Sequence, residues 1–270
     1  MIRTQDSTGT FPFGLWYEEE EIEKIMEDHR ARFFRTGIIK TATPFPIELF
    51  LEKYVPTVIG REVNFDPYAD VESKEGSGIW GATYFYHDHV DVKIDYRLTK
   101  QADQSIDKAG PYLITIAHEA SHCLMHAELL ETNSDDENIS STSEQPQSIC
   151  PSYDFNPVES DYDGRWWEVQ ANRGMAALMM PRDEFLFRFK RERKAYGMHD
   201  NVSLQEDEHK FGAVVGFLSR NFGVSKQAVK IRLIQLGQIK DDTKREKSFS
   251  GKSGLQPVQE ILRDFFRGYR

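Results

Sequence analysis

The spacing of hydrophobic residues changes several times along the chain, and each change predicts a different element. Near the N-terminus, apolar residues recur every three or four positions, which is the period of a helix with one buried face. Further on, apolar and polar residues alternate, which is the period of a half-buried strand. The predicted helices before the strands span 18–36 and 45–54, and the predicted strands span 79–86 and 90–96.

The two predicted strands are separated only by residues 87–89, so we expect an antiparallel hairpin. Loop and turn residues dominate the region before them, up to Gly78. Helical spacing returns at Pro111 and again at Trp166, and a further helix with several basic residues is expected after Pro181. The fold class is therefore predicted to be α+β, with a small antiparallel sheet packed against helices.

The last part of the chain predicts a separate helical unit. Residues 208–239 show two helical segments around a short turn, and Ser225 is suited to cap the second one. This is the pattern of a helix-turn-helix-like unit. We predict a first domain over 1–195, the helical unit over 196–240, and a polar linker with a short C-terminal helix over 241–270.

Charge changes this picture in one segment. The chain has 270 residues and a formal charge of −10, but residues 131–164 hold nine Asp or Glu and no Lys or Arg. Outside that segment the acidic and basic residues nearly balance. The segment also contains few large aliphatic residues, so we expect a long, mobile, acidic insert in the first domain.

The sequence also indicates a cytoplasmic protein without a membrane partner. No apolar stretch approaches the roughly 20 residues that span a bilayer, and the N-terminus lacks the apolar core of a secretory signal. Cys123 and Cys150 are the two cysteines. In a chain of this size they are more typical of thiols than of a disulfide framework.

The most specific chemistry lies on the helix that starts near Pro111. His118 and His122 are four residues apart, so both imidazoles lie on one helix face and can share a metal ion. Glu119 lies beside them, where a carboxylate can act as general base toward a metal-activated water. Zinc suits this chemistry because it lowers the pKa of bound water to about 7 and polarises a carbonyl.

A catalytic zinc site needs a third protein ligand, and Glu168 on the next predicted helix is the best candidate. Asn172 lies one turn further on, where its amide could accept the second ring N–H of a histidine ligand. The alternative is that Glu168 is an ordinary solvated carboxylate. We do not expect His126 to be a third histidine ligand, because a helix drifts by about 40° over four residues. Cys123 is expected to be a core thiol.

These residues resemble the ImmA/IrrE family of metallo-endopeptidases. In that family an HExxH helix is followed by a helix of the form E-x-x-A-N-x-x-A-x-x-L-M-x-P, and residues 168–181 are similar to it. Residues 114–119 and 222–233 also resemble the family, so the likeness covers about residues 80–240. Two features depart from it: Ser121 stands where the family usually has Gly, and the 131–164 insert is longer and more acidic.

The resemblance implies a zincin-like domain in which His118, His122 and Glu168 hold zinc and Glu119 is the general base. It implies a zinc-dependent endopeptidase that cleaves a regulatory protein, such as a helix-turn-helix repressor. The residues alone leave the oxyanion donor open among three candidates. These are Tyr84, His87 and Tyr112.

Two other functions are open at this point. From Phe217 to Arg270 there are twelve Lys or Arg against five Asp or Glu, so the helix-turn-helix-like unit could attract nucleic acid. This reading is not favoured, because Ile231 and Leu233 indicate that the second helix is largely buried. The other alternative is an interaction protein that keeps the fold without the chemistry.

Overall fold

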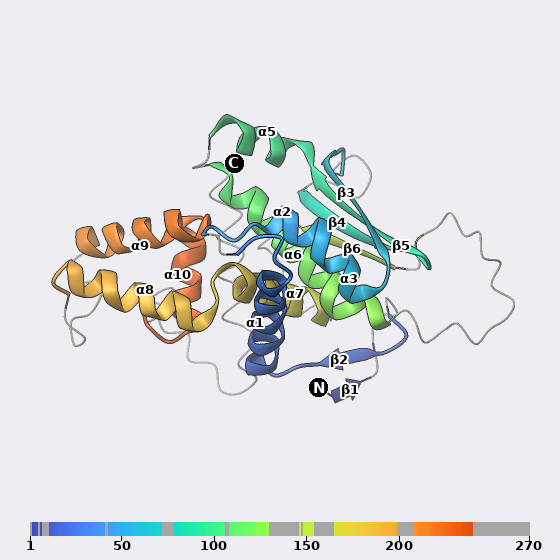
Figure 1. Ribbon diagram of the computed structural model, residues 1–270, viewed down its shortest axis with the longest axis horizontal. Helices are drawn as coiled ribbons and strands as arrows, with labels where there is room; N and C mark the ends of the chain where they lie inside the picture. Colours follow the sequence, from blue (N-terminus) through green and yellow to red (C-terminus); the bar gives the residue numbers. More distant parts are fainter. Residues whose placement is uncertain are drawn as a thin grey trace, which may run out of the picture.

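The computed structural model describes residues 2–4, 6, 11–40, 43–71, 78–105, 108–129, 146, 148–153, 165–198 and 208–239. These residues form a mixed fold of helices and small sheets, which confirms the α+β class in its broad sense (Figure 1). Most of the insert predicted over 131–164 lies outside the described residues, as do the linker and terminal helix predicted over 241–270. No helix among the described residues is both long and apolar enough to cross a membrane.

Most helices follow the predicted periodicity. The exception is α5, which begins directly after a strand because the Asp95 carboxylate accepts the Arg97 backbone N–H at 3.0 Å and caps the helix. The helices are α1 Glu19–Arg35, α2 Ile47–Leu49, the π-helical η1 Phe50–Tyr54, α3 Val55–Ile59, α5 Tyr96–Gln104, α6 Gly110–His126, α7 Trp166–Met179, α8 Arg182–Ala195, α9 Glu208–Phe222 and α10 Lys226–Gln235.

The main sheet has four strands in the order β3-β5-β4-β6. The predicted hairpin is confirmed as the antiparallel pair β4–β5. Two strands differ from the expectation: β3 lies where loop residues were expected and pairs parallel with β5, and β6 lies within the predicted acidic loop. The sheet is therefore mixed. The strands are β1 Ile2–Thr4, β2 Gly14–Trp16, β3 Glu62–Ala69, β4 Ile79–Phe85, β5 His89–Asp95 and β6 Ser148–Tyr153, with β1 and β2 forming a separate pair.

Both unexpected strands lie at the edges of the sheet. Each contains a proline, Pro67 in β3 and Pro151 in β6, and edge strands tolerate proline because one side makes no ladder hydrogen bonds. Proline together with Asp, Asn and Ser also weakens the sequence signal for a strand. Edge position therefore explains why periodicity did not predict them.

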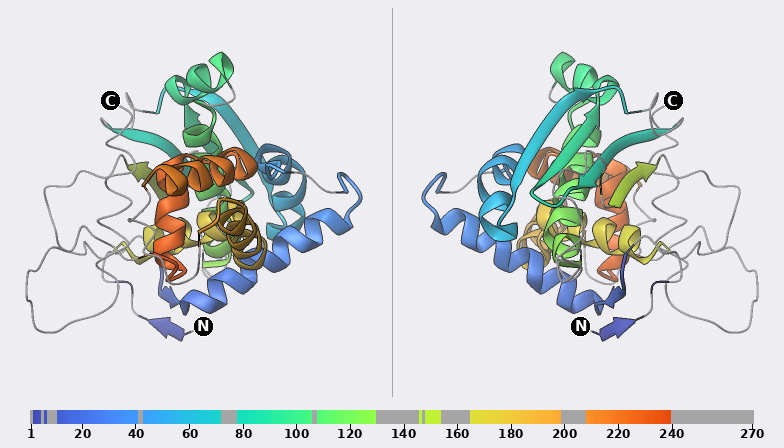
Figure 2. Two further views of the ribbon diagram at one scale, coloured as in Figure 1. Left: turned by 90° about the vertical axis from the view of Figure 1, so that its left-hand side faces the viewer. Right: turned by 90° about the vertical axis from the view of Figure 1, so that its right-hand side faces the viewer.

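The helix α6 lies at the centre of the fold. It contacts β4, β5 and β6 and also α7, which in turn packs against α1. Figure 1 shows α8, α9 and α10 at the opposite end of the molecule from the sheet, and Figure 2 shows α1 on the opposite side from α5. The residues of α6 are therefore enclosed between the sheet and α7.

Local sequence sets the ends of several helices. The Glu18 backbone N–H donates to the Glu21 carboxylate at 3.0 Å, and the acidic first turn of α1 suits the positive end of the helix dipole. Pro111 lies in the first turn of α6, where its missing N–H is tolerated. The predicted cap of α10 is confirmed, because Ser225 Oγ accepts the Ala228 backbone N–H at 3.0 Å.

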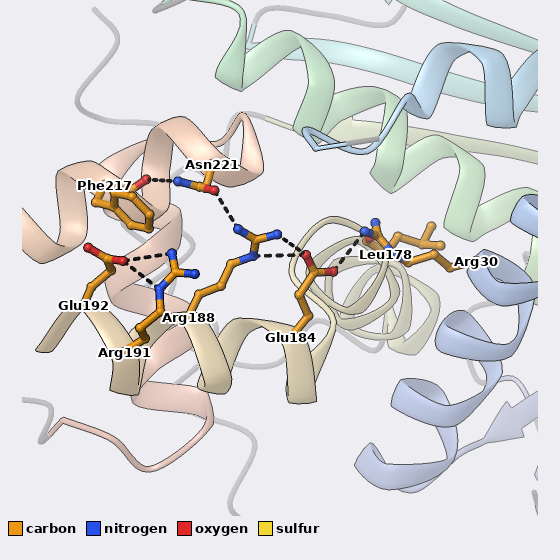
Figure 3. Close-up of polar contacts among 8 residues, drawn as sticks. All are labelled: Arg30, Leu178, Glu184, Arg188, Arg191, Glu192, Phe217 and Asn221. Atoms are coloured by element: carbon orange, nitrogen blue, oxygen red, sulfur yellow. Dashed lines mark hydrogen bonds and ion pairs between the residues drawn. The ribbon is translucent and has the colours of Figure 1, made fainter. Parts of the chain in front are cut away.

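Polar contacts connect the C-terminal helices to the rest of the molecule through α8 (Figure 3). Arg188 donates to Asn221 Oδ1 of α9 at 2.9 Å and to Glu184 Oε1 of its own helix at 2.8 Å. Glu184 also pairs with Arg30 of α1 at 3.3 Å, and Arg30 donates to the Leu178 carbonyl at 3.0 Å. The α9–α10 unit is thus anchored to α1 and α7.

Candidate metal centre

The face of α6 that meets α7 carries polar side chains in a setting that normally holds apolar ones. His118 is 6% exposed, and Glu119 and His122 are completely buried. Glu168 projects from α7 toward the two histidines and keeps 15% of its side-chain surface exposed. Three predicted ligands on two helices are therefore brought together, and they form a group that could hold a metal ion.

The two imidazole nitrogens and the carboxylate oxygens lie close to the separations that a tetrahedral ion requires. His118 Nε2 and His122 Nε2 are 2.9 Å apart, and the Glu168 carboxylate oxygens lie 3.3 Å from the first and 3.4 Å from the second. Two ligands at bonding distance from a tetrahedral zinc ion are about 3.4 Å apart. Only small adjustments would bring all three atoms onto one ion.

The opposite ring nitrogens of both histidines have partners of their own. His118 Nδ1 lies 3.0 Å from Asn172 Oδ1, an atom that can only accept, so the ring donates from Nδ1. The orienting role expected for Asn172 agrees with this contact. His122 Nδ1 lies 3.0 Å from His126 Nδ1. Both rings therefore direct Nε2 toward Glu168.

Two observations show that this cluster suits a cation. Glu168 Oε1 is buried and has no hydrogen-bond partner in the described part of the chain. The two Nε2 atoms face each other, and when both rings are protonated at Nδ1 their lone pairs repel. A cation bound among these three side chains would accept electron density from Glu168 Oε1 and from both Nε2 lone pairs.

In the metal-free protein a proton can supply part of that charge. Burial lowers the pKa of His118, but the hydrogen bond and negative charge of Glu168 outweigh it and raise this pKa above its ordinary value. Burial also raises the pKa of Glu168, but the charges on His122 and His118 hold it well below its usual range. The carboxylate therefore stays ionised and attracts cations.

Glu119 contacts the sheet. Thr83 of β4 donates from Oγ1 to Glu119 Oε2 at 2.6 Å. Gly81, two residues earlier on the same face of β4, leaves space for this carboxylate, because a Cβ there would lie 2.6 Å from Glu119 Oε1. The strand β4 thus fixes the carboxylate that the sequence predicts as the general base.

Ser121, the departure from the family pattern, is matched on the neighbouring helix. It faces Gly174 of α7, where an added Cβ would lie 2.8 Å from Ser121 Oγ. The Ser121 hydroxyl donates to the Ala117 carbonyl at 2.8 Å, so its polar group is satisfied. The two helices can therefore pack closely despite the extra side chain.

The remaining predictions near the site have mixed outcomes. His126 is not among the grouped ligands, as expected, and it bonds to His122. Burial, followed by the charge of His122, lowers the pKa of His126 to about 3, so its ring is neutral.

Cys123 and Cys150 are buried and are not joined by a disulfide. Burial and then the charge of Glu119 raise the pKa of the Cys123 thiol, which makes it unreactive.

The three oxyanion candidates lie away from the metal cluster. Tyr112 donates its hydroxyl to Glu48 of α2, and His87 is exposed in the β4–β5 turn. Tyr84 alternates with Thr83 along β4, so it points to the opposite face of the sheet, where Lys93 lies 4.7 Å from its ring centroid.

Sequence reasoning missed Thr83, Gly81 and Gln170. Thr83 and Gly81 contact Glu119 across 36 or more residues of chain, and Gln170 reaches His126 from another helix. Only the alternation of β4 offered a signal, since it puts Gly81 and Thr83 on one face.

No protein-family model and no curated protein matches this chain. The assignment of function therefore rests on the residues themselves.

Proposed function

We propose that this protein is a zinc-dependent endopeptidase of the ImmA/IrrE type, built on a zincin-like domain. One observation carries the proposal: the Nε2 atoms of His118 and His122 and the carboxylate of Glu168 converge from two helices at separations of 2.9–3.4 Å. The buried carboxylate of Glu119 lies beside this cluster, on the helix α6 that carries both histidines.

The donor set favours zinc over the hard cations. Two imidazole nitrogens and one carboxylate suit zinc, whereas Mg²⁺ and Ca²⁺ prefer sites made entirely of oxygen. Three protein ligands also leave one tetrahedral position for a reactant, which distinguishes a catalytic zinc site from a structural one. When bound, zinc would polarise a scissile carbonyl and lower the pKa of water to about 7.

The chain's own residues supply the rest of the chemistry. The Glu119 carboxylate takes the proton of the attacking water and later delivers it to the leaving amine. Thr83 holds one oxygen of that carboxylate by donating to Oε2, which limits its rotation. Asn172 holds the ring of His118 in the orientation that presents Nε2.

Solvent reaches the cluster from one side. His122 and Glu119 are buried, whereas Glu168 and, to a smaller extent, His118 keep exposed surface. A peptide substrate would therefore approach past Glu168. The resemblance to the ImmA/IrrE family is our reason for proposing a regulatory protein, such as a helix-turn-helix repressor, as that substrate.

The alternative of a DNA-binding protein finds less support. The helix α10, which would be the recognition helix, buries Ala228, Val229, Ile231, Arg232 and Leu233. Arg232 is 2% exposed and pairs with Glu23 of α1 instead of facing solvent. A recognition helix needs exposed side chains that reach base edges, so the contacts of α10 favour a packing role.

Metal analysis of the purified protein tests the proposal directly. We expect about one zinc per chain, absent from His122→Ala and Glu168→Ala but retained in Glu119→Gln. The Glu119→Gln protein should capture the substrate without cleaving it, while the unaltered protein cleaves it and loses activity with a chelator. A zinc-free protein, or normal cleavage by Glu119→Gln, would contradict the proposal. Zinc binding without any cleavage would favour the non-catalytic alternative.

A further inference from the structure

A row of buried polar groups leads from the candidate metal centre to the N-terminal strand β2. His122 Nδ1 lies 3.0 Å from His126 Nδ1, and His126 Nε2 lies 3.1 Å from Gln170 Oε1. The amide Nε2 of Gln170 donates to the backbone carbonyl of Leu15. His122 and His126 are completely buried, and Gln170 is 4% exposed.

Each link in this row has one direction that satisfies both atoms. The Leu15 carbonyl can only accept, so the NH₂ group of Gln170 faces it and the amide oxygen faces His126. His126 must therefore donate from Nε2, and its Nδ1 is left as an acceptor. His122 must then carry its proton on Nδ1, which leaves the lone pair on Nε2 directed at His118 and Glu168.

We propose that His126 and Gln170 are positioning residues that fix the tautomer and ring orientation of His122. We call the hydrogen-bonded row from His122 through His126 and Gln170 to the Leu15 carbonyl the relay, and the carbonyl is its fixed end. The inference rests on the metal site of the proposed function. The two histidine ligands are then held by different means. His118 donates directly to Asn172, whereas His122 is held through two further side chains that end on the backbone.

Aromatic side chains enclose the relay. The ring of Phe11 lies 5.8 Å from the His126 ring, and the Trp166 ring lies 5.5 Å from it, measured between centroids. Asp6 bonds to both of these aromatic residues, since its carboxylate accepts the Phe11 backbone N–H at 2.9 Å and the Trp166 Nε1–H at 3.3 Å. His126 is completely buried, and these two rings help to enclose it.

Zinc affinity, measured by competition with a chromophoric chelator on the full chain, tests the relay without any substrate. His126→Leu removes the acceptor for His122 Nδ1–H and should weaken zinc binding by about 10- to 100-fold, as is typical for the loss of an outer partner. His126→Asn places an amide oxygen near the former Nδ1 and should restore most of the affinity. Gln170→Leu should weaken binding less than His126→Leu, because His126 itself remains.

A matched control separates this effect from general damage to α6. Ile116 is completely buried and points away from the ligand face by about 160° from His118. Ile116→Ala should lower the unfolding temperature but leave zinc affinity unchanged. Wild-type affinity in a folded His126→Leu protein, or no rescue by His126→Asn, would overturn the relay.

The tautomers can also be read in the unaltered protein. Nitrogen-15 spectra of the imidazoles should show the proton on Nδ1 of His122 and on Nε2 of His126, with zinc or without it. A His126 ring protonated on Nδ1 would overturn the inference even if the variants fail to fold. Failure of the relay is separable from failure of the proposed function: the first appears in tautomers and relative affinities, the second as absent zinc or absent cleavage in the unaltered protein.

Discussion

Two regions of the molecule bury charged side chains, and they do so in opposite ways. At the interface of α10 with α1, Arg232 donates to both Glu23 carboxylate oxygens and to the Met180 carbonyl, so its donors have partners within the protein. At the interface of α6 with α7, the buried oxygen of Glu168 and two imidazole nitrogens converge without such mutual satisfaction. The first arrangement is complete by itself, whereas the second is a group that could hold a metal ion.

This contrast separates a structural charge from a ligand-binding one. Burying a charge is unfavourable unless hydrogen bonds and an opposite charge compensate for it. Arg232 is compensated by Glu23, and α10 is thereby attached to α1. The cluster of His118, His122 and Glu168 would be compensated by a metal ion. The two regions should therefore respond differently to the loss of one carboxylate.

The largest expected effect is on zinc binding when that carboxylate is Glu168. If the roughly 10–16 kcal/mol of a structural zinc site is shared among four ligands, each contributes about 2.5–4 kcal/mol. Glu168→Ala should therefore weaken zinc binding by about 100- to 1000-fold. Glu23→Ala, which removes a carboxylate from the structural pair, should leave zinc affinity unchanged. Calorimetric titration of both variants checks this, and equal losses would erase the distinction between the two regions.

The second expected effect is on stability and concerns Arg232. Arg232→Met removes the partner of Glu23 and should reduce the free energy of unfolding by about 3 kcal/mol, the lower end for a broken buried pair because Glu23 is partly exposed. Lys230→Met, on the exposed side of the same helix, should change it by less than about 0.5 kcal/mol. Urea unfolding monitored by circular dichroism measures both.

A further replacement sharpens the same test. Adding Glu23→Leu to Arg232→Met removes the carboxylate that the single variant leaves without its partner, so much of the lost stability should return. A double variant no more stable than Arg232→Met would show that the two side chains do not act as a pair.

The two regions also differ in how far sequence could predict them. The two candidate histidine ligands follow from spacing within α6, since local periodicity fixes which residues share a face. Glu168 is favoured as the third because residues 168–181 resemble the ImmA/IrrE pattern. The partner of Arg232 could not be predicted, because Glu23 lies 209 residues away and the contact depends on how α10 packs on α1. The residue types of His126 and Gln170 can be read from the sequence. Their hydrogen bond could not be predicted, because it depends on how α6 and α7 lie relative to each other.

The same distinction applies to the sheet. The hairpin β4–β5 followed from alternation and a short turn, both of which are local. The parallel strand β3 and the edge strand β6 pair with partners distant in the chain, and their prolines and polar residues obscure the pattern. The contact of Thr83 with Glu119 depends on how α6 packs on β4, so the support of the candidate base was not predictable either.

The third prediction concerns pH and applies to the metal centre alone. Burial opposes a charge on His118, but Glu168 outweighs it and raises the pKa of His118 above 6.5 in the metal-free protein. A proton therefore competes with zinc for this site below the raised pKa of His118. As the pH falls through the raised pKa, apparent zinc affinity should fall by about tenfold per pH unit for each proton displaced. Affinity that stays constant from pH 8 to 6 in folded protein would contradict this.

The smallest expected effect tests the packing that brings the two helices of the metal centre together. Gly174→Ala would add a Cβ 2.8 Å from Ser121 Oγ and 2.9 Å from Met26 Cε, so α7 must shift slightly away from α6. We expect a loss of about 1 kcal/mol in the free energy of unfolding. Weaker zinc binding should accompany it, because Glu168 lies on the same helix as Gly174.

Combining this change with Ser121→Gly separates the contact from the substitution itself. Glycine at 121 removes the closest atoms, although glycine within a helix is itself unfavourable by up to about 1 kcal/mol. Met26 ends in a flexible side chain that can move aside. The double variant should therefore be more stable than the sum of the single effects predicts, by about 0.5 kcal/mol or more. Additive losses in stability, with unchanged zinc affinity, would mean that the Ser121–Gly174 contact does not set the distance between the two ligand-bearing helices.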